Sequence, residues 1–529
     1  MKPTCPRCGG KLRRNGFTPG GSQRWACRNG AAGRTHCYTT TDPKAETVRK
    51  QDGSTKRRSK APIFTRTIGR TQARFLVTAA QNATPVHQGF LKSLEVACNN
   101  LNAELLVIPL RYKNPTSRWT KSQANDEVWA PEVTPYLYNQ RKALNKNIVV
   151  LGDIKTQPTA SSPLTGFDAI THGESAILGH TKLQLRVVPT PQSRFPKILT
   201  TTGACTKPNY TDSRAGKLGE FHHTLGAALV EARGKIFHLR QINADAHSGE
   251  FTDLDRRYFP AGFEEAKPAQ ALTMGDTHVD FVDPGVDKAT FGTDGIVETL
   301  RPQHLIFHDL LDGYSVNPHH VGNPFAALVK RQTGRDNAKD EARRAIEFLE
   351  NRLLGAKAIV VPSNHDDFLR RWILNTDWRG DPTNAWFYLR TALAMVESAK
   401  MTPQGVQYAD PFRYWVNQHF GEVEASRVRC LAQDESFTLD GVEYGLHGDR
   451  GPNGSRGSAR SLRRIGVKTV IGHSHTPAIE EGCYQTGTST RLRLEYNAGP
   501  SSWLQSHVIQ YALGGKRCLI NIIEGEWRL

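Results

Sequence analysis

Short apolar runs that end in polar clusters recur along the second half of this 529-residue chain. Each run is three to five residues long, is largely composed of strand-favouring residues, and suits a buried strand. The runs cover residues 271–274, 305–307, 358–361, 442–446 and 467–471. We therefore expect five strands with polar side chains at their carboxyl ends, the sheet edge at which open α/β folds bind ligands.

Apolar patterning also predicts elements outside these five runs. Further strands are expected at residues 74–79, 105–110, 148–151, 183–188 and 236–239, and helices at 89–101, 222–232 and 325–354. This mixture predicts a separate mixed α/β domain of unknown role over residues 71–268, followed by a second α/β domain over residues 269–529. An apolar content of 38% supports folded cores in both domains.

The polar clusters after the five strands contain oxygen and imidazole donors and no cysteine. In chain order they are Gly275-Asp276-Thr277-His278, Phe307-His308-Asp309, Ser363-Asn364-His365-Asp366, Leu446-His447-Gly448-Asp449 and Gly472-His473-Ser474-His475. Such donors suit a pair of divalent metal ions in a hydrolytic site, which holds a phosphate and generates the attacking hydroxide.

The order of these motifs resembles the calcineurin-like metallophosphoesterases, which include phosphatases, phosphodiesterases and Mre11/SbcD-type nucleases. The resemblance covers roughly residues 270–500 and implies an α/β fold with a four-layer β-sandwich flanked by helices. It implies that Asp309 bridges two metals, that Asp276, His278 and His475 complete one site, and that Asn364, His447 and His473 complete the other. Mn²⁺ is the preferred ion, with Fe, Zn or Ni as alternatives.

The same resemblance implies roles for two residues beside the ligands. His365 matches the histidine that stabilises the transition state or protonates the leaving oxygen, and Asp366 is expected to orient it. Two positions depart from the family pattern, because His308 and Ser363 stand where the family usually has glycine. We expect His308 to point into the core, although it could also crowd the turn or contribute to the site. Asp312 is a second candidate acid, but the spacing favours Asp309 as the bridge.

Four cysteines close together predict a structural zinc site in residues 1–42. They are Cys5, Cys8, Cys27 and Cys37. Four thiolates suit tetrahedral zinc, and the intervening residues resemble the zinc ribbons of some transposases and phage DNA-binding proteins. The last spacing departs from the ribbon pattern, so His36 could replace Cys37. A disulfide reading fits less well, because no secretory segment is recognised and the other five cysteines are scattered.

Positive charge is concentrated at the amino terminus. Residues 1–74 contain 18 Lys and Arg against three acids, a balance of +15, which leaves +3 of the total +18 for the rest of the chain. Residues 43–70 are expected to be a basic flexible linker. DNA is the expected partner, although a solvated basic tail is the simpler alternative. The candidate DNA contacts in this region are Arg13, Arg14, Arg24, Lys56, Arg57 and Arg58.

An aromatic insertion is expected within the second domain, at residues 367–440. Its aromatic residues could stack on bases or form the core of a helical cap. Arg370 and Arg371 at its start are candidate phosphate contacts.

These features together predict a metal-dependent DNA nuclease with a basic zinc-ribbon head. A phosphatase or nucleotide phosphodiesterase recruited to nucleic acid, or a DNA-binding factor without activity, are the alternatives. The domain order loosely resembles the early host-DNA-degradation proteins of T5-type bacteriophages. No apolar run approaches the ~20 residues that span a bilayer, so a cytoplasmic protein without a membrane partner is expected. A homodimer is a further possibility that the family suggests.

Overall fold

The computed structural model describes residues 72–110, 128–403, 405–424, 427–495 and 497–529, with side chains except at 422–424. It also describes the backbone of three strands near the amino terminus. The chain divides into two compact units, Met1–Ile63 and Phe64–Leu529.

The first unit contains one antiparallel sheet, formed by β1 (Arg13–Phe17), β2 (Gln23–Cys27) and β3 (His36–Thr39). Cys27 lies opposite His36, and Ala26 lies opposite Cys37. Two of the predicted zinc ligands therefore lie on neighbouring strands, while Cys5 and Cys8 lie outside the described residues. So do Lys56, Arg57 and Arg58. The zinc site and the basic contacts stay predictions.

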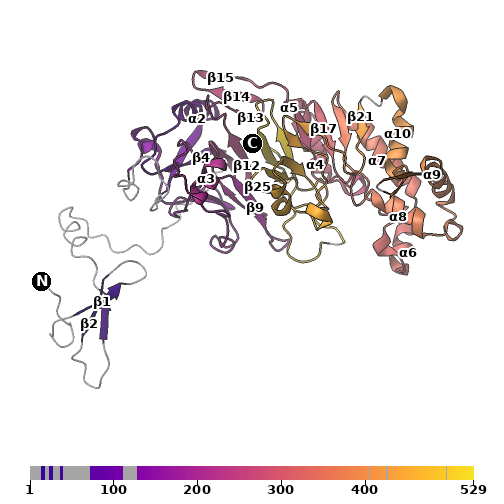
Figure 1. Ribbon diagram of the computed structural model, residues 1–529, viewed down its shortest axis with the longest axis horizontal. Coiled ribbons are helices and arrows are strands. Elements are labelled where there is room, and N and C mark those ends of the chain that lie inside the picture. The colour runs from indigo at the N-terminus through magenta and orange to yellow at the C-terminus, as the bar shows by residue number, and fades with distance from the viewer. Residues whose placement is uncertain are drawn as a thin grey trace. The chain divides into compact units, whose positions relative to one another are not determined.

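A long mixed sheet runs through the second unit (Figure 1). Its ten strands in spatial order are β22 (Thr438–Leu439), β23 (Val442–Glu443), β24 (Lys468–Ile471), β26 (Cys483–Gln485), β25 (Ala478–Glu480), β9 (Gln184–Val188), β10 (Lys197–Thr201), β8 (Ser175–Leu178), β7 (Ile148–Leu151) and β6 (Arg141–Ala143). Five strands come from each half of the sequence, and the two sets meet at the β25–β9 pair.

Two shorter sheets lie side by side against the long one. The first contains β21 (Val428–Cys430), β18 (Lys357–Val360), β17 (His304–Phe307), β16 (Ala271–Thr273), β27 (Ser506–Gln510) and β28 (Arg517–Asn521), and the second contains β12 (Ile236–Asn243), β11 (Gly226–Arg233), β4 (Ala73–Gln81) and β5 (Ala103–Leu110). Their edges meet because Leu239 N donates to Asn521 Oδ1 (2.9 Å) and Leu519 N donates to Gln241 Oε1 (3.2 Å). One apolar core contains residues of all three sheets.

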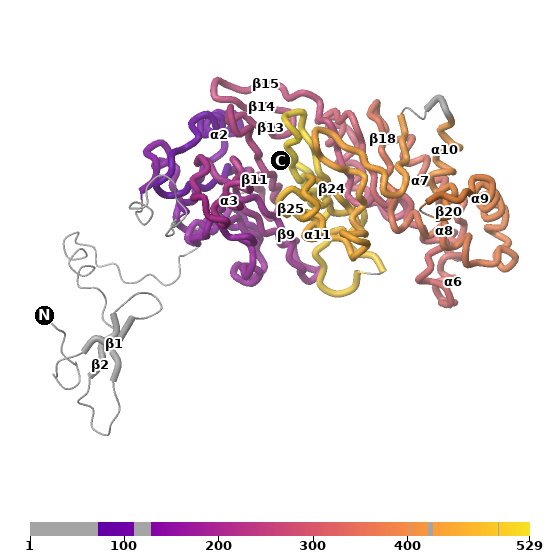
Figure 2. The backbone as a smooth tube through the Cα atoms, in the orientation of Figure 1, coloured from indigo at the N-terminus to yellow at the C-terminus, as the bar shows by residue number. Residues whose placement is uncertain are grey.

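Helices cover the outer faces of the two shorter sheets (Figure 2). The helices α4 (Pro284–Phe291), α5 (Ile296–Leu300), α7 (Ala338–Arg352), α8 (Asp367–Asn375), α9 (Ala385–Ser398) and α10 (Pro411–Glu424) share a core with the six-stranded sheet, and α2 (Gln88–Leu101) packs on the four-stranded one. The long sheet packs instead against the short α11 (Ala459–Leu462) and against loop residues such as Leu164. The layers are thus helix, sheet, sheet, and a thinner cover of loops.

The strands expected at the metal-ligand motifs are confirmed as β16, β17, β18, β23 and β24, and the helix expected at 89–101 is confirmed as α2. The helix expected at 222–232 is wrong. The chain there forms the end of α3 (Arg214–Phe221) and then β11, whose residues are buried on both faces. Because both faces are buried, the apolar run has no alternation and is mistaken for a helix.

Two other expectations differ in detail. The single helix expected at 325–354 is two helices, α6 (Pro324–Gln332) and α7, each begun by an asparagine that caps it. The boundary expected between residues 268 and 269 does not separate two compact bodies, since Phe64–Leu529 is one unit with a shared sheet. Among the described residues, no helix combines the length and apolar character needed to cross a bilayer.

Candidate metal centre

The predicted ligands come from loops that follow five strands in two different sheets. Asp276 and His278 follow β16, Asp309 follows β17 and Asn364 follows β18, all in the six-stranded sheet, whereas His447 follows β23 and His473 and His475 follow β24 in the long sheet. The two sheets face one another, so their carboxyl-terminal loops meet at one end of the shared core. The structure brings all seven side chains together there.

Asp309 occupies the middle of this cluster. Its Oδ2 lies 3.4 Å from Nε2 of His278 and 3.4 Å from Nε2 of His447, and the side chain is buried. One carboxylate thus faces two imidazoles that belong to different predicted sites. This is the position that a bridging ligand requires.

Each side of Asp309 carries its own group of donors. On one side, Nε2 of His475 lies 3.3 Å from Asp276 Oδ2 and 3.0 Å from Nε2 of His278. These contacts group the first predicted set around a common point.

On the other side, Oδ1 of Asn364 lies 3.1 Å from Nε2 of His447 and 3.0 Å from Nδ1 of His473. These contacts group the second predicted set, and Asp276 also lies close to Asp309 and His447.

Buried oxygens without partners indicate that the cluster fits cations. Both carboxylate oxygens of Asp276 and Oδ1 of Asp309 are buried and meet no hydrogen-bond partner among the described residues. An unsatisfied buried carboxylate is costly unless a cation or a proton compensates it. The donor set of carboxylate, amide oxygen and imidazole suits Mn²⁺, Fe or Zn.

The electrostatics of the cluster point in the same direction. Burial, and next the Asp309 carboxylate, raise the pKa of Asp276 to about 7. Burial lowers the pKa of His278 and of His447, but Asp309 and the other nearby acids together outweigh it and raise each pKa to about 9. The bare cluster therefore retains protons, and bound divalent ions would displace them.

Backbone strain is concentrated at the same positions. Four of the seven candidate ligands have a positive φ, namely His278 (41°), Asp309 (46°), His473 (76°) and His475 (55°). Non-glycine residues rarely adopt this conformation, and it persists where the surrounding structure enforces it, often at functional sites. The strained loops turn these four ligands inward within two to five residues of a strand end.

His365 lies next to the ligands and is oriented by Asp312. Its Nδ1 donates to the backbone oxygen of Asp312 (2.7 Å), which leaves Nε2 free of that bond. Its ring meets that of His278 edge-on, with centroids 4.5 Å apart. A cavity of about 500 Å³ is lined by His365, Asn364 and Asp312 among others, so a substrate could reach this imidazole.

Asp366 does not take the orienting role that we expected. It is buried, its backbone N–H donates to Ser363 Oγ, and its Oδ1 has no partner in the described part of the chain. No hydrogen bond or ion pair joins the Asp366 side chain to His365 among the described residues. Asp312 orients both His365 and His278, whose Nδ1 lies 2.8 Å from Asp312 Oδ1.

His308 is a second residue whose place the sequence did not settle. It is fully buried, and its Nδ1 lies 3.4 Å from Nδ1 of His447. Burial, and next His447, lower its pKa to about 3, so a neutral His308 can position the His447 ring. It therefore lies in the core, as expected, and also contacts the site. Both His308 and Asp312 lie within three residues of Asp309 in the sequence, and this closeness was the signal that could have predicted their contact with the site.

The two arginines predicted to contact phosphate share one carboxylate. Asp367 pairs with Arg370 (2.5 Å) and with Arg371 (2.7 Å), and Arg370 also donates to the Tyr408 hydroxyl (3.3 Å). A phosphate would have to compete with this carboxylate. Many of the aromatic residues of the insertion, including Trp372, belong to its apolar core with the six-stranded sheet.

Comparison with known proteins gives one informative relative. No protein-family model matches the chain. The chain is 32% identical over 504 residues to "Protein A1" of Escherichia phage T5, an alignment that covers 92% of this chain and 89% of that protein. Similarity of this extent places both proteins in one family. The chain therefore belongs to the family of the phage T5 protein A1.

Proposed function

We propose that the protein is a metal-dependent nuclease that hydrolyses phosphodiester bonds in DNA, with the metallophosphoesterase arrangement of ligands. The observation that carries the proposal is the pair of donor groups that share Asp309, one with Asp276, His278 and His475 and one with Asn364 and two histidines. Two divalent ions bound there would polarise the phosphate and supply the nucleophile.

The residues around the centre perform the remaining tasks. Asp309 holds both donor groups in register, because its Oδ2 faces an imidazole of each. Asp312 fixes the His365 tautomer with the proton on Nδ1, since the carbonyl oxygen can only accept. Nε2 of His365 would carry a second proton in the imidazolium form and would give that proton to the leaving oxygen of the substrate.

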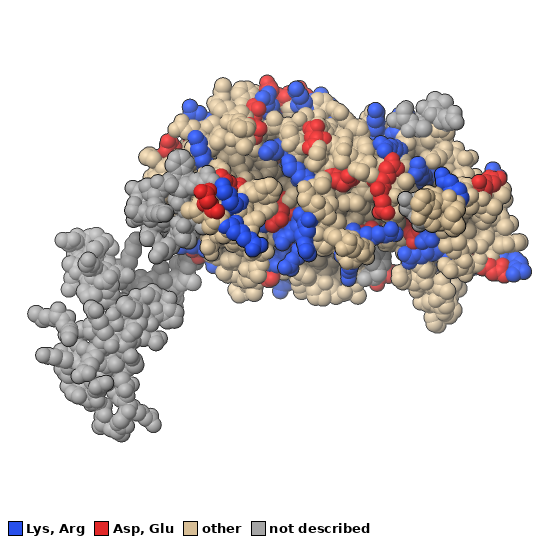
Figure 3. All heavy atoms as spheres, viewed as in Figure 1, with Lys and Arg blue, Asp and Glu red and all other residues tan. Residues whose placement is uncertain are grey.

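DNA is the favoured substrate because of the charge distribution. Residues 1–74 hold +15 of the total +18, and on the face of the molecule in Figure 3 basic and acidic side chains are interspersed. A basic segment joined to the catalytic unit would add salt-sensitive, sequence-independent affinity for a polyanion. A small phosphorylated metabolite would gain little from such a segment.

The test is cleavage of linear and circular plasmid DNA by wild type, Asp309→Asn and His365→Ala in Mn²⁺, Mg²⁺, Zn²⁺ or EDTA. The control is Asp340→Asn, which removes an exposed carboxylate from α7. We expect both site variants to lose cleavage and the control to retain it.

Parallel assays separate the alternatives. Turnover of a phosphomonoester with intact DNA would replace the proposal by a phosphatase. Tight DNA binding without turnover of any substrate would replace it by a DNA-binding factor.

A further inference from the structure

The ten-stranded sheet has the same strand order from either edge. From one edge it runs β6, β7, β8, β10, β9, and from the other β22, β23, β24, β26, β25. In the first set β6 is antiparallel to β7, the strands β7, β8 and β10 are parallel, and β9 is antiparallel to β10. The second set has the same directions, with β22 antiparallel to β23, the strands β23, β24 and β26 parallel, and β25 antiparallel to β26. The fourth strand of each set in chain order is thus β9 or β25. The two fourth strands, β9 and β25, then pair with each other.

The facing sheets repeat the correspondence. In the four-stranded sheet β5 is parallel to β4, β4 is antiparallel to β11 and β11 to β12. In the six-stranded sheet the same relations join β17, β16, β27 and β28 in that order. Nine strands of the amino-terminal half, β4–β12, therefore match nine strands of the carboxyl-terminal half in chain order, direction and neighbours. The latter adds β18 and β21 at its outer edge.

Short sequence matches lie at equivalent positions. Leu178-Gly179-His180 at the end of β8 corresponds to Ile471-Gly472-His473 at the end of β24. Thr202-Gly203 after β10 corresponds to Thr486-Gly487 after β26. A Cβ added to Gly179 would lie 2.6 Å from Ile108 at the end of β5, and one added to Gly472 would lie 3.1 Å from His308 just after β17. The same close approach of two strand ends thus requires glycine in both halves.

The amino-terminal half lacks the metal ligands. The contacts of Gly179 with Ile108 and of Gly472 with His308 make Pro109 the equivalent of Asp309, and the parallel registers then make Ala80 the equivalent of Asp276. Two residues after the matching histidines, Lys182 stands where the other half has His475. His180, the equivalent of His473, is buried and satisfied by protein atoms, since its Nε2 contacts Gln157 O and its Nδ1 accepts from Lys182 N, both at 2.9 Å.

We infer that residues 73–243 are a second, metal-free copy of the catalytic sandwich, which serves as its built-in partner. This copy covers the edges of β25 and β28, which would otherwise expose unpaired backbone groups. A chain of this kind has one metal centre and needs no second subunit on that face.

The first test compares the equivalent histidines by metal content and does not depend on catalysis. Full-length wild type, His180→Ala and His473→Ala are loaded with Mn²⁺, dialysed and measured by mass spectrometry. We expect two ions per chain in wild type, two in His180→Ala and fewer in His473→Ala. Four ions in wild type, or a loss in His180→Ala, would overturn the inference that the amino-terminal copy is metal-free.

The second test concerns the β9–β25 pair, in which Leu185 lies opposite Ile479. Leu185→Ala in the full chain removes a buried side chain from the shared core. We expect one unfolding transition at a lower temperature, with hydrogen exchange in β25 accelerated together with that in β9. A separate early transition that leaves β25 protected would show that the copies do not act as partners.

A cavity beside the metal centre carries an independent inference. It has a volume of about 780 Å³ and lies between the Ser363–Asp366 loop, α8, α10 and the hairpin of β19 (Lys400–Thr402) and β20 (Gly405–Gln407). The same loop also contributes Asn364 and His365 to the cavity at the metal centre, so the two cavities share a wall.

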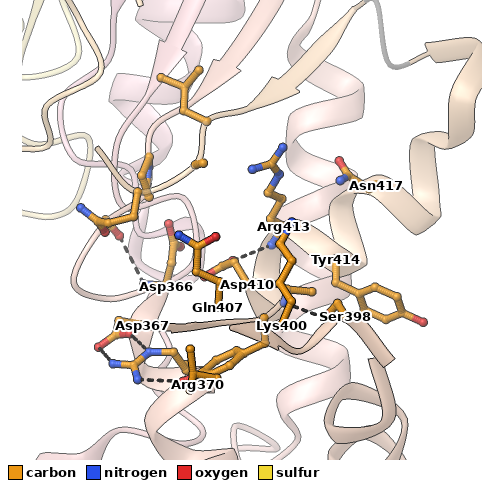
Figure 4. A pocket seen from close by; sticks show the side chains of 18 of the residues that line it. Asp366, Asp367, Arg370, Ser398, Lys400, Gln407, Asp410, Arg413, Tyr414 and Asn417 are labelled. Atoms are coloured by element: carbon orange, nitrogen blue, oxygen red, sulfur yellow. Dashed lines mark hydrogen bonds and ion pairs between the residues drawn. The ribbon is translucent and has the colours of Figure 1, made fainter. Parts of the chain in front are cut away.

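Several side chains that line this cavity suit a nucleotide, beside the carboxylates of Asp366, Asp367 and Asp410 (Figure 4). Lys400 and Arg413 line it without an ion pair in the described part of the chain, in contrast to Arg370. Asp366 is buried with an unpartnered Oδ1 that can accept from a base amino group. The ring of Tyr414 offers a stacking surface and Asn417 an amide.

We propose that this cavity holds the nucleotide next to the scissile phosphate, with Lys400 and Arg413 binding the adjoining phosphate. The proposal rests on the nuclease function above and names its substrate subsite. Arg370 and Arg371, held by Asp367, position the start of α8 rather than the strand.

The test is the ratio of kcat/KM for a single-stranded oligonucleotide to that for bis(4-nitrophenyl) phosphate, which lacks a neighbouring nucleotide. We expect Lys400→Ala/Arg413→Ala to lower this ratio at least tenfold and the control Arg379→Ala, an exposed arginine paired with Asp377, to preserve it. An unchanged ratio would overturn the subsite.

If wild type cleaves neither substrate, the nuclease proposal fails and binding decides the subsite separately. Binding of a fluorescent dinucleotide in EDTA that is weakened by the double substitution would uphold the cavity as a nucleotide site. Equal binding by wild type and variant would contradict a nucleotide site in this cavity.

Discussion

Replacing Asp309 with asparagine changes one oxygen of a buried side chain and removes the charge shared by the two donor groups. Its Oδ2 lies 3.4 Å from an imidazole nitrogen on each side, and we take this distance as the separation of the carboxylate from a neighbouring positive charge. At this separation and an effective dielectric constant of about 20, one unit-charge interaction is worth about 5 kcal/mol. An interaction of this size corresponds to a fall in affinity on the order of 10³- to 10⁴-fold per unit of cation charge, so each divalent ion should lose at least this much.

Calorimetric titration of the metal-free protein with Mn²⁺ measures this loss directly. A second readout is the pKa of His278 and of His447, which Asp309 together with other nearby acids raises to about 9 against the effect of burial. Each pKa should fall in Asp309→Asn when followed by NMR. Burial opposes ionisation of Asp309, but His447 and the other nearby histidines hold its pKa well below the usual value, so its charge stabilises the metal-free fold. The metal-free variant should therefore unfold at a lower temperature than wild type. Mn²⁺ affinity within tenfold of wild type, with unchanged histidine pKa values, would refute the bridging position of Asp309.

Three further predictions address the loops, the pH dependence and the head. A Cβ at Gly472 would lie 2.2 Å from Asp276 Oδ1, so Gly472→Ala should lose Mn²⁺ affinity in the same titration, whereas Gly482→Ala, whose nearest atom is 3.6 Å away, should not. Burial opposes ionisation of Glu231, but its arginine neighbours lower its pKa from 4.5 to about 2, so about 3 kcal/mol of stability should be present above pH 4.5 and lost towards pH 2. The free energies of unfolding of wild type and Glu231→Gln, measured in urea from pH 7 to 2.5, should therefore converge as the pH falls. A constant difference between them would contradict this. Deletion of residues 1–63 should reduce DNA affinity and its salt dependence in fluorescence anisotropy while small-diester turnover is retained.

The ligand loops could be predicted from sequence because their signal is local. Each strand and the donor that follows it lie within a few residues, as with Thr273 and Asp276, so pattern and chemistry are read together. The role of Asp312 could not be predicted in this way. Its contacts to His278 and His365 depend on how the loops after three strands fold back on one another.

The relation between the two halves also escaped sequence reasoning. Leu185 and Ile479 pair across nearly 300 positions, and nothing in either short strand specifies its partner. The repeated Gly-His and Thr-Gly steps are only two residues long, too short to indicate a repeat before the strand order is known. The helix mistakenly expected at 222–232 concealed β11, one of the nine matching strands.

The pairing of β9 with β25 also constrains how the chain folds during synthesis. β9 ends at Val188, whereas its partner begins at Ala478, and β12 meets β28, which ends at Asn521. Contacts of such long range form late because a long loop must close first. A ribosome would have released almost the whole chain before these edges are covered, so the nascent amino-terminal copy would depend on chaperones or rapid completion to avoid aggregation. Truncated translation products should accordingly be insoluble and carry no metal centre.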